Sequence, residues 1–235
     1  MIDTILFDLD GTLLPLDPQK FTDVYFPALA EKIVPLGYDG ETLIKAVWKG
    51  TASMQANSGT TLNHHYFWQT FCDILGGDAA SLEPVCDDFY QNEFNIVKTI
   101  LPKNINHKKL ISSLKDRGYT LVLASNPVFP LVAVQTRLSW IGLSTADFDY
   151  ISHYQNSRFC KPNLGYYTEI LANIKKKPEQ CLMVGNNLIE DGCISKLGAQ
   201  VYLVIDMLEG GNMSDIDAFP HGPIEDLEDY LNLIC

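Results

Sequence analysis

Residues 5–14 read Ile-Leu-Phe-Asp-Leu-Asp-Gly-Thr-Leu-Leu, a short apolar run that ends in two carboxylates, a glycine and a threonine. Such a run is typical of a buried strand in a parallel sheet. Side chains two residues apart in a strand point to the same side, so we expect Asp8 and Asp10 to share one side at the strand's carboxyl end. In open α/β sheets, ligands bind at that edge.

Two carboxylates this close together need a positive partner. At ~4 Å and an effective dielectric constant of ~20, Asp8 and Asp10 would repel each other by roughly 4 kcal/mol. The motif therefore predicts a cation at the end of the first strand, together with a substrate that needs one.

The charge of the chain argues against nucleic-acid binding. The 235 residues carry a formal net charge of −12, and residues 206–235 contain eight acidic residues and no Lys or Arg, which leaves −4 for residues 1–205. Nucleic-acid binding needs basic patches, so we expect no nucleic-acid partner. No apolar run approaches the ~18 residues of a membrane span, so we expect no membrane partner either.

The cysteine pattern predicts reduced thiols. The six cysteines include no CxxC pair, which favours a reducing compartment over a disulfide framework; they are Cys72, Cys86, Cys160, Cys181, Cys193 and Cys235. The first strand begins almost at once, which leaves no space for a signal peptide. We therefore expect a cytoplasmic protein.

Residues 18 to about 98 are predicted to be almost wholly helical. Apolar residues recur at helical spacing in four segments, residues 21–33, 43–54, 67–75 and 82–96, each typical of an amphipathic helix. Because strands and helices do not alternate here, this part is expected to form a helical module of its own.

From residue 102 strands and helices alternate. We expect helices at 104–117, 130–141, 163–175 and 189–197, strands at 119–124, 150–151, 181–184 and 200–205, and a terminal helix at 223–233, with 206–222 irregular. This alternation predicts a Rossmann-like parallel sheet covered by helices on both faces. The predicted organisation is an α/β core of residues 1–14 and 101–235, interrupted by an α-helical cap of residues 15–100.

Three further polar elements stand at predicted strand ends. Ser125 and Asn126 follow one strand, Lys161 precedes a helix, and residues 185–191 (GNNLIED) follow another strand. Taken singly, each has an ordinary explanation as a helix cap, a surface lysine or an acidic first turn of a helix. Together they are all expected at the same edge of the sheet as Asp8 and Asp10.

The Asp-x-Asp-Gly-Thr motif, followed in order by these three elements, resembles the haloacid dehalogenase-like (HAD) hydrolase superfamily over residues 1–14 and 101–205. The resemblance implies that Asp8 attacks phosphorus to form an aspartyl-phosphate and that Asp10 is the general acid and base. It also implies that Lys161 balances negative charge, that Ser125 binds phosphate, and that backbone amides near Leu9 and Asn126 help.

The resemblance further implies a Mg²⁺ ion, held by Asp8, Asp10, Asn186 and Asp191. The chain departs from the family here, because the fourth motif is often Gly-Asp and this chain has Asn186 after Gly185. We expect weaker metal binding, or direct use of Asp191 or its neighbour Glu190. The sequence leaves open which of these three residues bind the metal.

The predicted function is a Mg²⁺-dependent phosphatase that acts on a small phosphorylated metabolite. A phosphomutase of the same superfamily is the alternative, and so is a non-catalytic phosphate-binding or regulatory protein on this scaffold. Dinucleotide-binding and P-loop glycine motifs are absent. Residues such as His64, Tyr66 and Trp68 are candidates for selecting the leaving group, although aromatic residues at helical spacing are more often core. The sequence indicates neither the substrate nor the oligomeric state.

Overall fold

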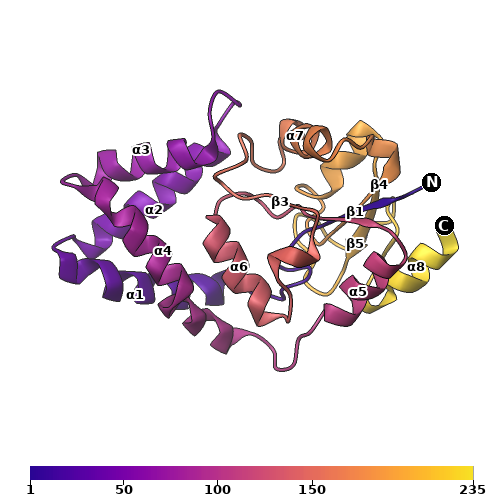
Figure 1. Ribbon diagram of the computed structural model, residues 1–235, viewed down its shortest axis with the longest axis horizontal. Coiled ribbons are helices and arrows are strands. Elements are labelled where there is room, and N and C mark those ends of the chain that lie inside the picture. Colours follow the sequence, from indigo (N-terminus) through magenta and orange to yellow (C-terminus); the bar gives the residue numbers. More distant parts are fainter. Residues whose placement is uncertain (235) are drawn as a thin grey trace.

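The computed structural model describes residues 1–234 and contains one six-stranded parallel sheet (Figure 1). The strands, in the order in which they lie across the sheet, are β3 (Tyr150–Ile151), β2 (Thr120–Leu123), β1 (Thr4–Phe7), β4 (Cys181–Gly185), β5 (Gln200–Val204) and β6 (His221–Gly222). The predicted α/β class is confirmed, and the first strand occupies the interior of the sheet.

The register of β1 aligns the strand ends that carry the polar motifs. Phe7 lies opposite Leu123 on one side and Val184 on the other. The pairing continues past the strand, where the amide of Asp8 donates to the carbonyl of Val184 at 2.9 Å. The residues that follow β1, β2 and β4 therefore leave the sheet at one common edge.

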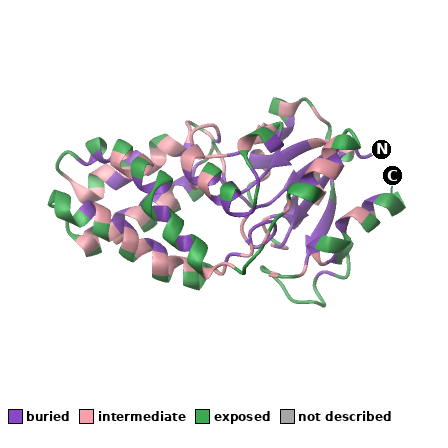
Figure 2. Ribbon diagram, turned by 60° about the horizontal axis from the view of Figure 1, so that its bottom comes forward, coloured by how far each residue is buried: buried purple, intermediate pink, exposed green. Residues whose placement is uncertain are grey.

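Alternating side chains of β1 enter two different cores. Ile5 and Phe7 belong to one apolar cluster, whereas Leu6 belongs to a second cluster on the opposite face. Helices α5 (Lys108–Asp116), α6 (Leu131–Trp140) and α8 (Leu227–Ile234) contribute to the first cluster, and α7 (Leu164–Ile174) contributes to the second. Because the strands are covered on both faces, they are buried almost throughout (Figure 2).

Residues 18–100, called here the helical segment, contain helices and connecting turns but no strand. The helices are α1 (Pro18–Ile33), α2 (Gly40–Gln55), α3 (Asn63–Leu75) and α4 (Glu83–Gln91), with 3₁₀ turns at Val34–Leu36, Ala79–Leu82 and Glu93–Ile100. Side-chain caps fix the starts of two helices, since Asp17 accepts from the amides of Gln19 and Lys20 and Asp39 accepts from the amide of Thr42. The segment occupies the end of the molecule away from both chain termini (Figure 1).

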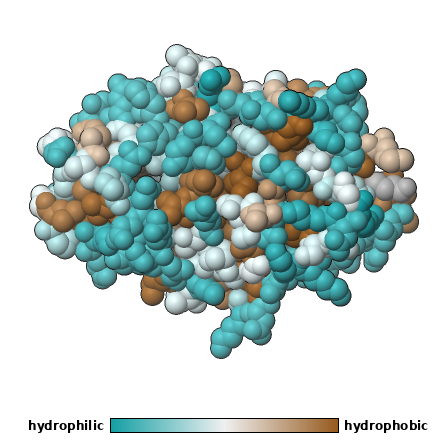
Figure 3. Space-filling view, in the orientation of Figure 1, coloured by the Kyte–Doolittle hydropathy of each residue, from teal (hydrophilic) through white to brown (hydrophobic). Residues whose placement is uncertain are grey.

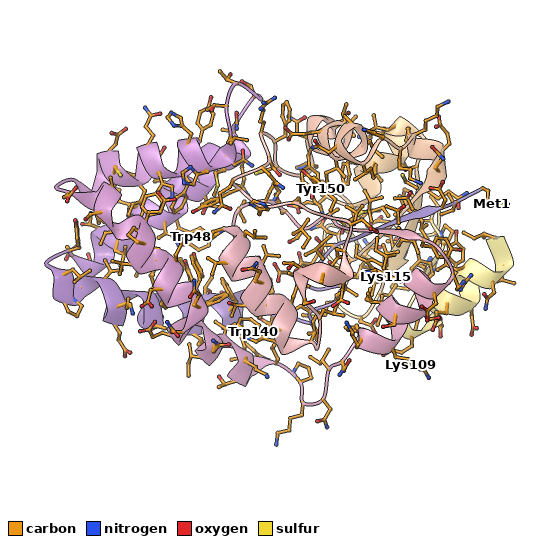
Figure 4. The ribbon with its side chains drawn as sticks, in the orientation of Figure 1. Met1, Trp48, Lys109, Lys115, Trp140 and Tyr150 are labelled. Carbon is orange, nitrogen blue, oxygen red and sulfur yellow. The ribbon has the colours of Figure 1, made fainter. Side chains whose placement is uncertain are left out.

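Helix α6 joins the helical segment to the sheet. The rings of Phe94 and Trp140 lie 5.1 Å apart, and the Trp140 indole donates to Asn95 Oδ1 at 2.9 Å. The Thr136 hydroxyl donates to the carbonyl of Tyr90 at 2.8 Å. Trp140 is labelled near the end of α6 in Figure 4. The apolar core on this face of the sheet therefore continues into the helical segment.

Two sequence expectations were wrong. The helix expected at 189–197 is a 3₁₀ helix at Gly192–Leu197, because Asn187 Oδ1 accepts from the amides of Ile189 and Glu190 and closes a turn first. Residues 206–222 were expected to be irregular, which holds for 206–220, whereas the last two residues form β6 and pair with β5. With only two residues and a proline before it, β6 carries no alternating pattern. In addition, α5 begins at Lys108 rather than 104.

Two remaining expectations concern the membrane and the thiols. Within residues 1–234, none of the helices is both long enough and apolar enough to cross a bilayer. The five described cysteines are unpaired thiols, and Cys235 lies outside the described residues. The face seen in Figure 3 is mostly hydrophilic, with apolar atoms in patches along its middle.

We predict that Phe94→Ala lowers the free energy of unfolding by about 3–5 kcal/mol, because it removes a fully buried ring at the junction with α6. Ile96→Ala is the control, since Ile96 lies in the same 3₁₀ turn and is 46% exposed; its effect should stay within about 0.5 kcal/mol. Urea unfolding measures both. Equal small effects would show that this junction contributes little to stability.

Candidate active site

A small pocket of about 140 Å³ opens at the carboxyl edge of the sheet. Its lining contains most of the residues that the sequence analysis had singled out, and five of the lining residues carry carboxyl groups. The lining residues are Asp8, Asp10, Leu16, Pro18, Ser125, Asn126, Asn186, Asn187, Glu190, Asp191 and Glu209. None of these residues is Lys, Arg or His. The predicted site residue Leu9 differs from the others, because its side chain is buried in the apolar core and only its backbone is available to a ligand.

Lys161 lies beneath the pocket and links two of these carboxylates. Its Nζ atom is 2.8 Å from Asp8 Oδ1 and 2.6 Å from Asp191 Oδ1, and the lysine side chain is 0% exposed. Burial disfavours the ammonium form, but Asp191 and Asp8 outweigh it and raise the pKa of Lys161 well above its usual value. Lys161 is therefore a permanent positive charge in the site.

Asp8 remains short of positive charge despite this contact. Burial raises the pKa of the Asp8 carboxyl to about 7, Lys161 opposes that shift, and the negative charge of Asp191 adds to it. One lysine shared between two carboxylates does not neutralise both of them. The site therefore favours the arrival of a further cation.

Two glycines allow the site to close. A Cβ atom on Gly185 would lie 2.2 Å from Asp191 Oδ2, and one on Gly11 would lie 2.2 Å from Asn186 Nδ2. Gly11 also has a φ of +84°, a left-handed conformation that other residues adopt only with strain. The glycines of the two predicted motifs therefore let acidic and amide side chains pack directly against the backbone.

Thr12 connects the first motif to the fourth. Its hydroxyl lies 3.4 Å from Asp8 Oδ2 and 3.1 Å from Asn186 Oδ1. Asn186 is fixed from its other end, because Nδ2 donates to the carbonyl of Met207 at 2.6 Å. One oxygen of Asn186 and one of Asp8 therefore lie within reach of the same hydroxyl, although Asn186 is not acidic.

Asp191 is engaged through both of its oxygens. Oδ1 accepts from Lys161, and Oδ2 accepts from the amide of Asn187 at 2.9 Å. Its neighbour Glu190 instead accepts from Asn126 Nδ2 at 3.1 Å, and burial raises the pKa of the Glu190 carboxyl, which Lys161 opposes. These contacts favour Asp191 as the residue that orients Lys161.

Arg137 is a site residue that the sequence analysis missed. It is 1% exposed, forms an ion pair with Asp10 Oδ2, and places its guanidinium 4.4 Å from the centre of the Phe129 ring. Asp10 Oδ1 and Arg137 Nη2 are both buried without a hydrogen-bond partner within residues 1–234. The available signal was a single charged residue in the otherwise uncharged helix Leu131–Trp140.

Ser125 is held by two residues that no motif identified. Its carbonyl oxygen accepts from the hydroxyls of Ser152 and Tyr166, both at 2.8 Å. This support fixes the backbone at Ser125, which lines the pocket.

The segment around Lys161 leads into helix α7. The Lys161–Pro162 peptide bond is cis, and α7 begins at Leu164 with Asn163 as its cap.

Comparison with known proteins agrees with this arrangement. The chain is 24% identical over 201 residues to a ribulose-1,5-bisphosphate 5-phosphatase of Halopiger xanaduensis, covering 81% of this chain and 79% of the relative. Among solved structures, a 2-haloacid dehalogenase from Pseudomonas syringae pv. Tomato DC3000 is similar over 100% of both chains, with a TM-score of 0.64 and 17% identity. CbbY from Rhodobacter sphaeroides, in complex with phosphate, covers 97% of this chain and 96% of its own, with a TM-score of 0.58 and 19% identity.

The family comparison extends beyond shared fold. The sequence model described as haloacid dehalogenase-like hydrolase matches residues 2–191, which include every polar motif of the pocket. The resemblance predicted from residues 5–14 is thereby confirmed, and so is the prediction of an enzyme. The chain belongs to the haloacid dehalogenase-like hydrolases.

Proposed function

We propose that the protein is a Mg²⁺-dependent phosphatase that hydrolyses a small phosphomonoester through an aspartyl-phosphate. The observation that carries this proposal is the contact between the buried Lys161 ammonium and Asp8, at the end of the central strand and at the floor of the pocket. Phosphoryl transfer depends mainly on positioning and on charge stabilisation, and this contact serves both. The phosphatase relative from Halopiger xanaduensis supports the same chemistry.

Asp8 is the proposed nucleophile. A carboxylate oxygen of Asp8 forms a bond to phosphorus while the bond between phosphorus and the ester oxygen breaks. Lys161, fixed by Asp191, holds the Asp8 carboxylate in place and offsets the charge of the phosphoryl group. Ser125 and Asn126 line the pocket beside it, where their polar atoms are available to the phosphoryl oxygens.

Asp10 is the proposed general acid and base. It donates a proton to the departing alcohol in the first step. In the second step it accepts a proton from the water that attacks phosphorus, while the bond between phosphorus and the Asp8 oxygen breaks and inorganic phosphate is released. Arg137 is proposed as the positioning residue for this exchange, because its ion pair with Asp10 stabilises the carboxylate that is left after the first proton transfer.

The charges of the pocket support a divalent cation. Five carboxyl residues line the pocket, while Lys161 and Arg137 are the only cations among the described residues that form ion pairs with its carboxylates. We propose that Asp8, the Asp10 carbonyl and Asn186 hold Mg²⁺, which keeps several waters and needs few protein oxygens. Asp191 and Glu190, which also line the pocket, stay secondary candidates. When bound, Mg²⁺ neutralises charge on the phosphoryl oxygens.

Residues 15–100 are proposed to form the cap, and residues 1–14 and 101–235 the α/β core. Pro18, the first residue of the helical segment, and Leu16, two residues before it, line the catalytic pocket directly. Movement of this segment would admit substrate and then exclude water. Hydrolysis is favoured over the phosphomutase alternative, because a phosphomutase must also bind the ester through a second phosphate. No cationic side chain among residues 1–234 lines the pocket. The non-catalytic alternative is disfavoured by the joint presence of Asp8, Asp10 and Lys161.

We predict that Asp8→Asn lowers kcat/KM for p-nitrophenyl phosphate at least about a thousandfold, because an amide cannot form the acyl-phosphate. Asp23→Asn on the exposed face of α1 is the matched control and should retain native activity. Circular dichroism establishes that both variants fold. A folded Asp8→Asn variant with near-native turnover would remove Asp8 as the nucleophile.

We predict that Asn186→Asp lowers the Mg²⁺ concentration needed for half-maximal activity several-fold, because affinity in oxygen-ligand sites rises with ligand charge. Activity is titrated against Mg²⁺ for the native chain, Asn186→Asp and Asp191→Asn. Asp191→Asn should lower kcat through the loss of its contact with Lys161, with a smaller change in the Mg²⁺ requirement. The charge-deficit argument fails if Asn186→Asp leaves that requirement unchanged while Asp191→Asn raises it.

A further inference from the structure

A second cavity, larger than the catalytic pocket, lies between the helical segment and residues 128–130 and 154 of the remaining chain. It has a volume of about 230 Å³ and is lined mainly by aromatic and aliphatic side chains of α1, α2 and α3, among them Phe21, Leu43, Trp48 and Phe71. Trp48, labelled in Figure 4, lies within the helical segment. Folded proteins contain few voids larger than a water molecule, so an apolar cavity of this size is available to a ligand.

Four of the polar side chains around this cavity are bonded to one another in two pairs. The hydroxyls of Tyr25 and Tyr90 lie 2.9 Å apart, and the Trp68 indole donates to the Tyr154 hydroxyl at 3.2 Å. No Asp, Glu, Lys, Arg or His is among the residues, all within 1–234, that line it. A polyol placed there would lose its hydrogen bonds to water and gain few in return, which is costly.

The cavity adjoins the catalytic pocket. Pro18 lines both, and the segment that follows Asn126 supplies residues 128–130 to the wall of the cavity. Phe129 in this segment also packs against Arg137, which pairs with Asp10. A group attached to a phosphate in the pocket would therefore reach the cavity by passing Pro18.

The size of the cavity limits its occupant. An apolar cavity of about 150 Å³ lined by Leu, Ile and Phe binds benzene, so about 230 Å³ accepts a phenyl ring with a short linker. The charge of the lining limits the occupant further. Neither pocket is lined by a Lys, Arg or His among the described residues, so a second phosphate, such as a sugar bisphosphate carries, would meet no cation.

We propose that this cavity binds the leaving group, and that the substrate is a monophosphate ester of an alcohol carrying an apolar group of about phenyl size. This proposal rests on the proposed phosphatase activity. It assigns Tyr25 of α1, Trp68 of α3 and Tyr90 of α4 to substrate selection. It also implies that this chain prefers a different substrate from the ribulose-1,5-bisphosphate in the name of its phosphatase relative.

The first test compares esters whose alcohols have similar basicity. We expect kcat/KM to rise about fourfold per methylene through ethyl, propyl and butyl phosphate, and to be at least about a hundredfold higher for 2-phenylethyl phosphate than for ethyl phosphate. Ribose 5-phosphate should rank no higher than ethyl phosphate. A preference for ribose 5-phosphate over 2-phenylethyl phosphate would overturn the proposal.

The second test fills the cavity. Thr51 of α2 lines it, and Thr51→Phe should lower kcat/KM for 2-phenylethyl phosphate at least about tenfold while leaving ethyl phosphate unchanged. Ala52→Phe is the matched control, because Ala52 is the next residue of α2, is exposed and does not line the cavity. If Thr51→Phe loses activity equally toward both esters while Ala52→Phe does not, the Thr51→Phe variant is misfolded. In that case the proposal is judged by the ester series on the native chain.

Binding measurements separate the two ways in which the proposal can fail. We expect 2-phenylethylphosphonate to bind at least about a hundredfold more tightly than ethylphosphonate by calorimetry, in the presence of Mg²⁺. Equal affinities would overturn the cavity assignment whether or not esters are hydrolysed. Tight binding without hydrolysis of any ester would overturn the phosphatase activity and leave the apolar site standing.

Discussion

The architecture of the site depends on one buried ammonium, that of Lys161, which two carboxylates from different loops share. Asp8 follows the central strand and Asp191 follows β4, so the lysine ties together three segments that are far apart in the sequence. Removing one partner from a buried pair of this kind costs about 3–5 kcal/mol, because a charge is left uncompensated. The contact therefore stabilises the fold and prepares the site at the same time.

At the same edge of the sheet, a second ion pair fixes the position of the Asp10 carboxylate. Its partner Arg137 comes from α6, the helix that also packs against Phe94 and Tyr90 of the helical segment. Phe129 stacks on Arg137 and lines the apolar cavity. The proposed acid–base residue and the proposed leaving-group site thus share one structural support, so that changes in the helical segment can reach Asp10 through two packed side chains.

Much of the core and of the site was predictable from local sequence. The apolar run before Asp8, the polar ends after residues 123 and 184, and Lys161 before α7 all carry their signal within a few residues, and the structure brings them to one pocket. The rest depends on contacts between distant residues. Arg137 looks like an ordinary helix residue until Asp10 lies beside it, and the 3₁₀ helix at Gly192–Leu197 follows from the Asn187 turn. The apolar cavity arises only when separate helices leave space between them.

The central claim is that Asp8, held by Lys161, carries the phosphoryl group. Quenching the enzyme during turnover with borohydride tests this claim directly, since the reagent reduces an aspartyl-phosphate to homoserine, and peptide mass spectrometry then locates the product. We expect homoserine at position 8 when substrate and Mg²⁺ are both present, and none when substrate is omitted. Homoserine at position 10, or its absence from a rapidly quenched enzyme that is turning over, would contradict the assignment of Asp8.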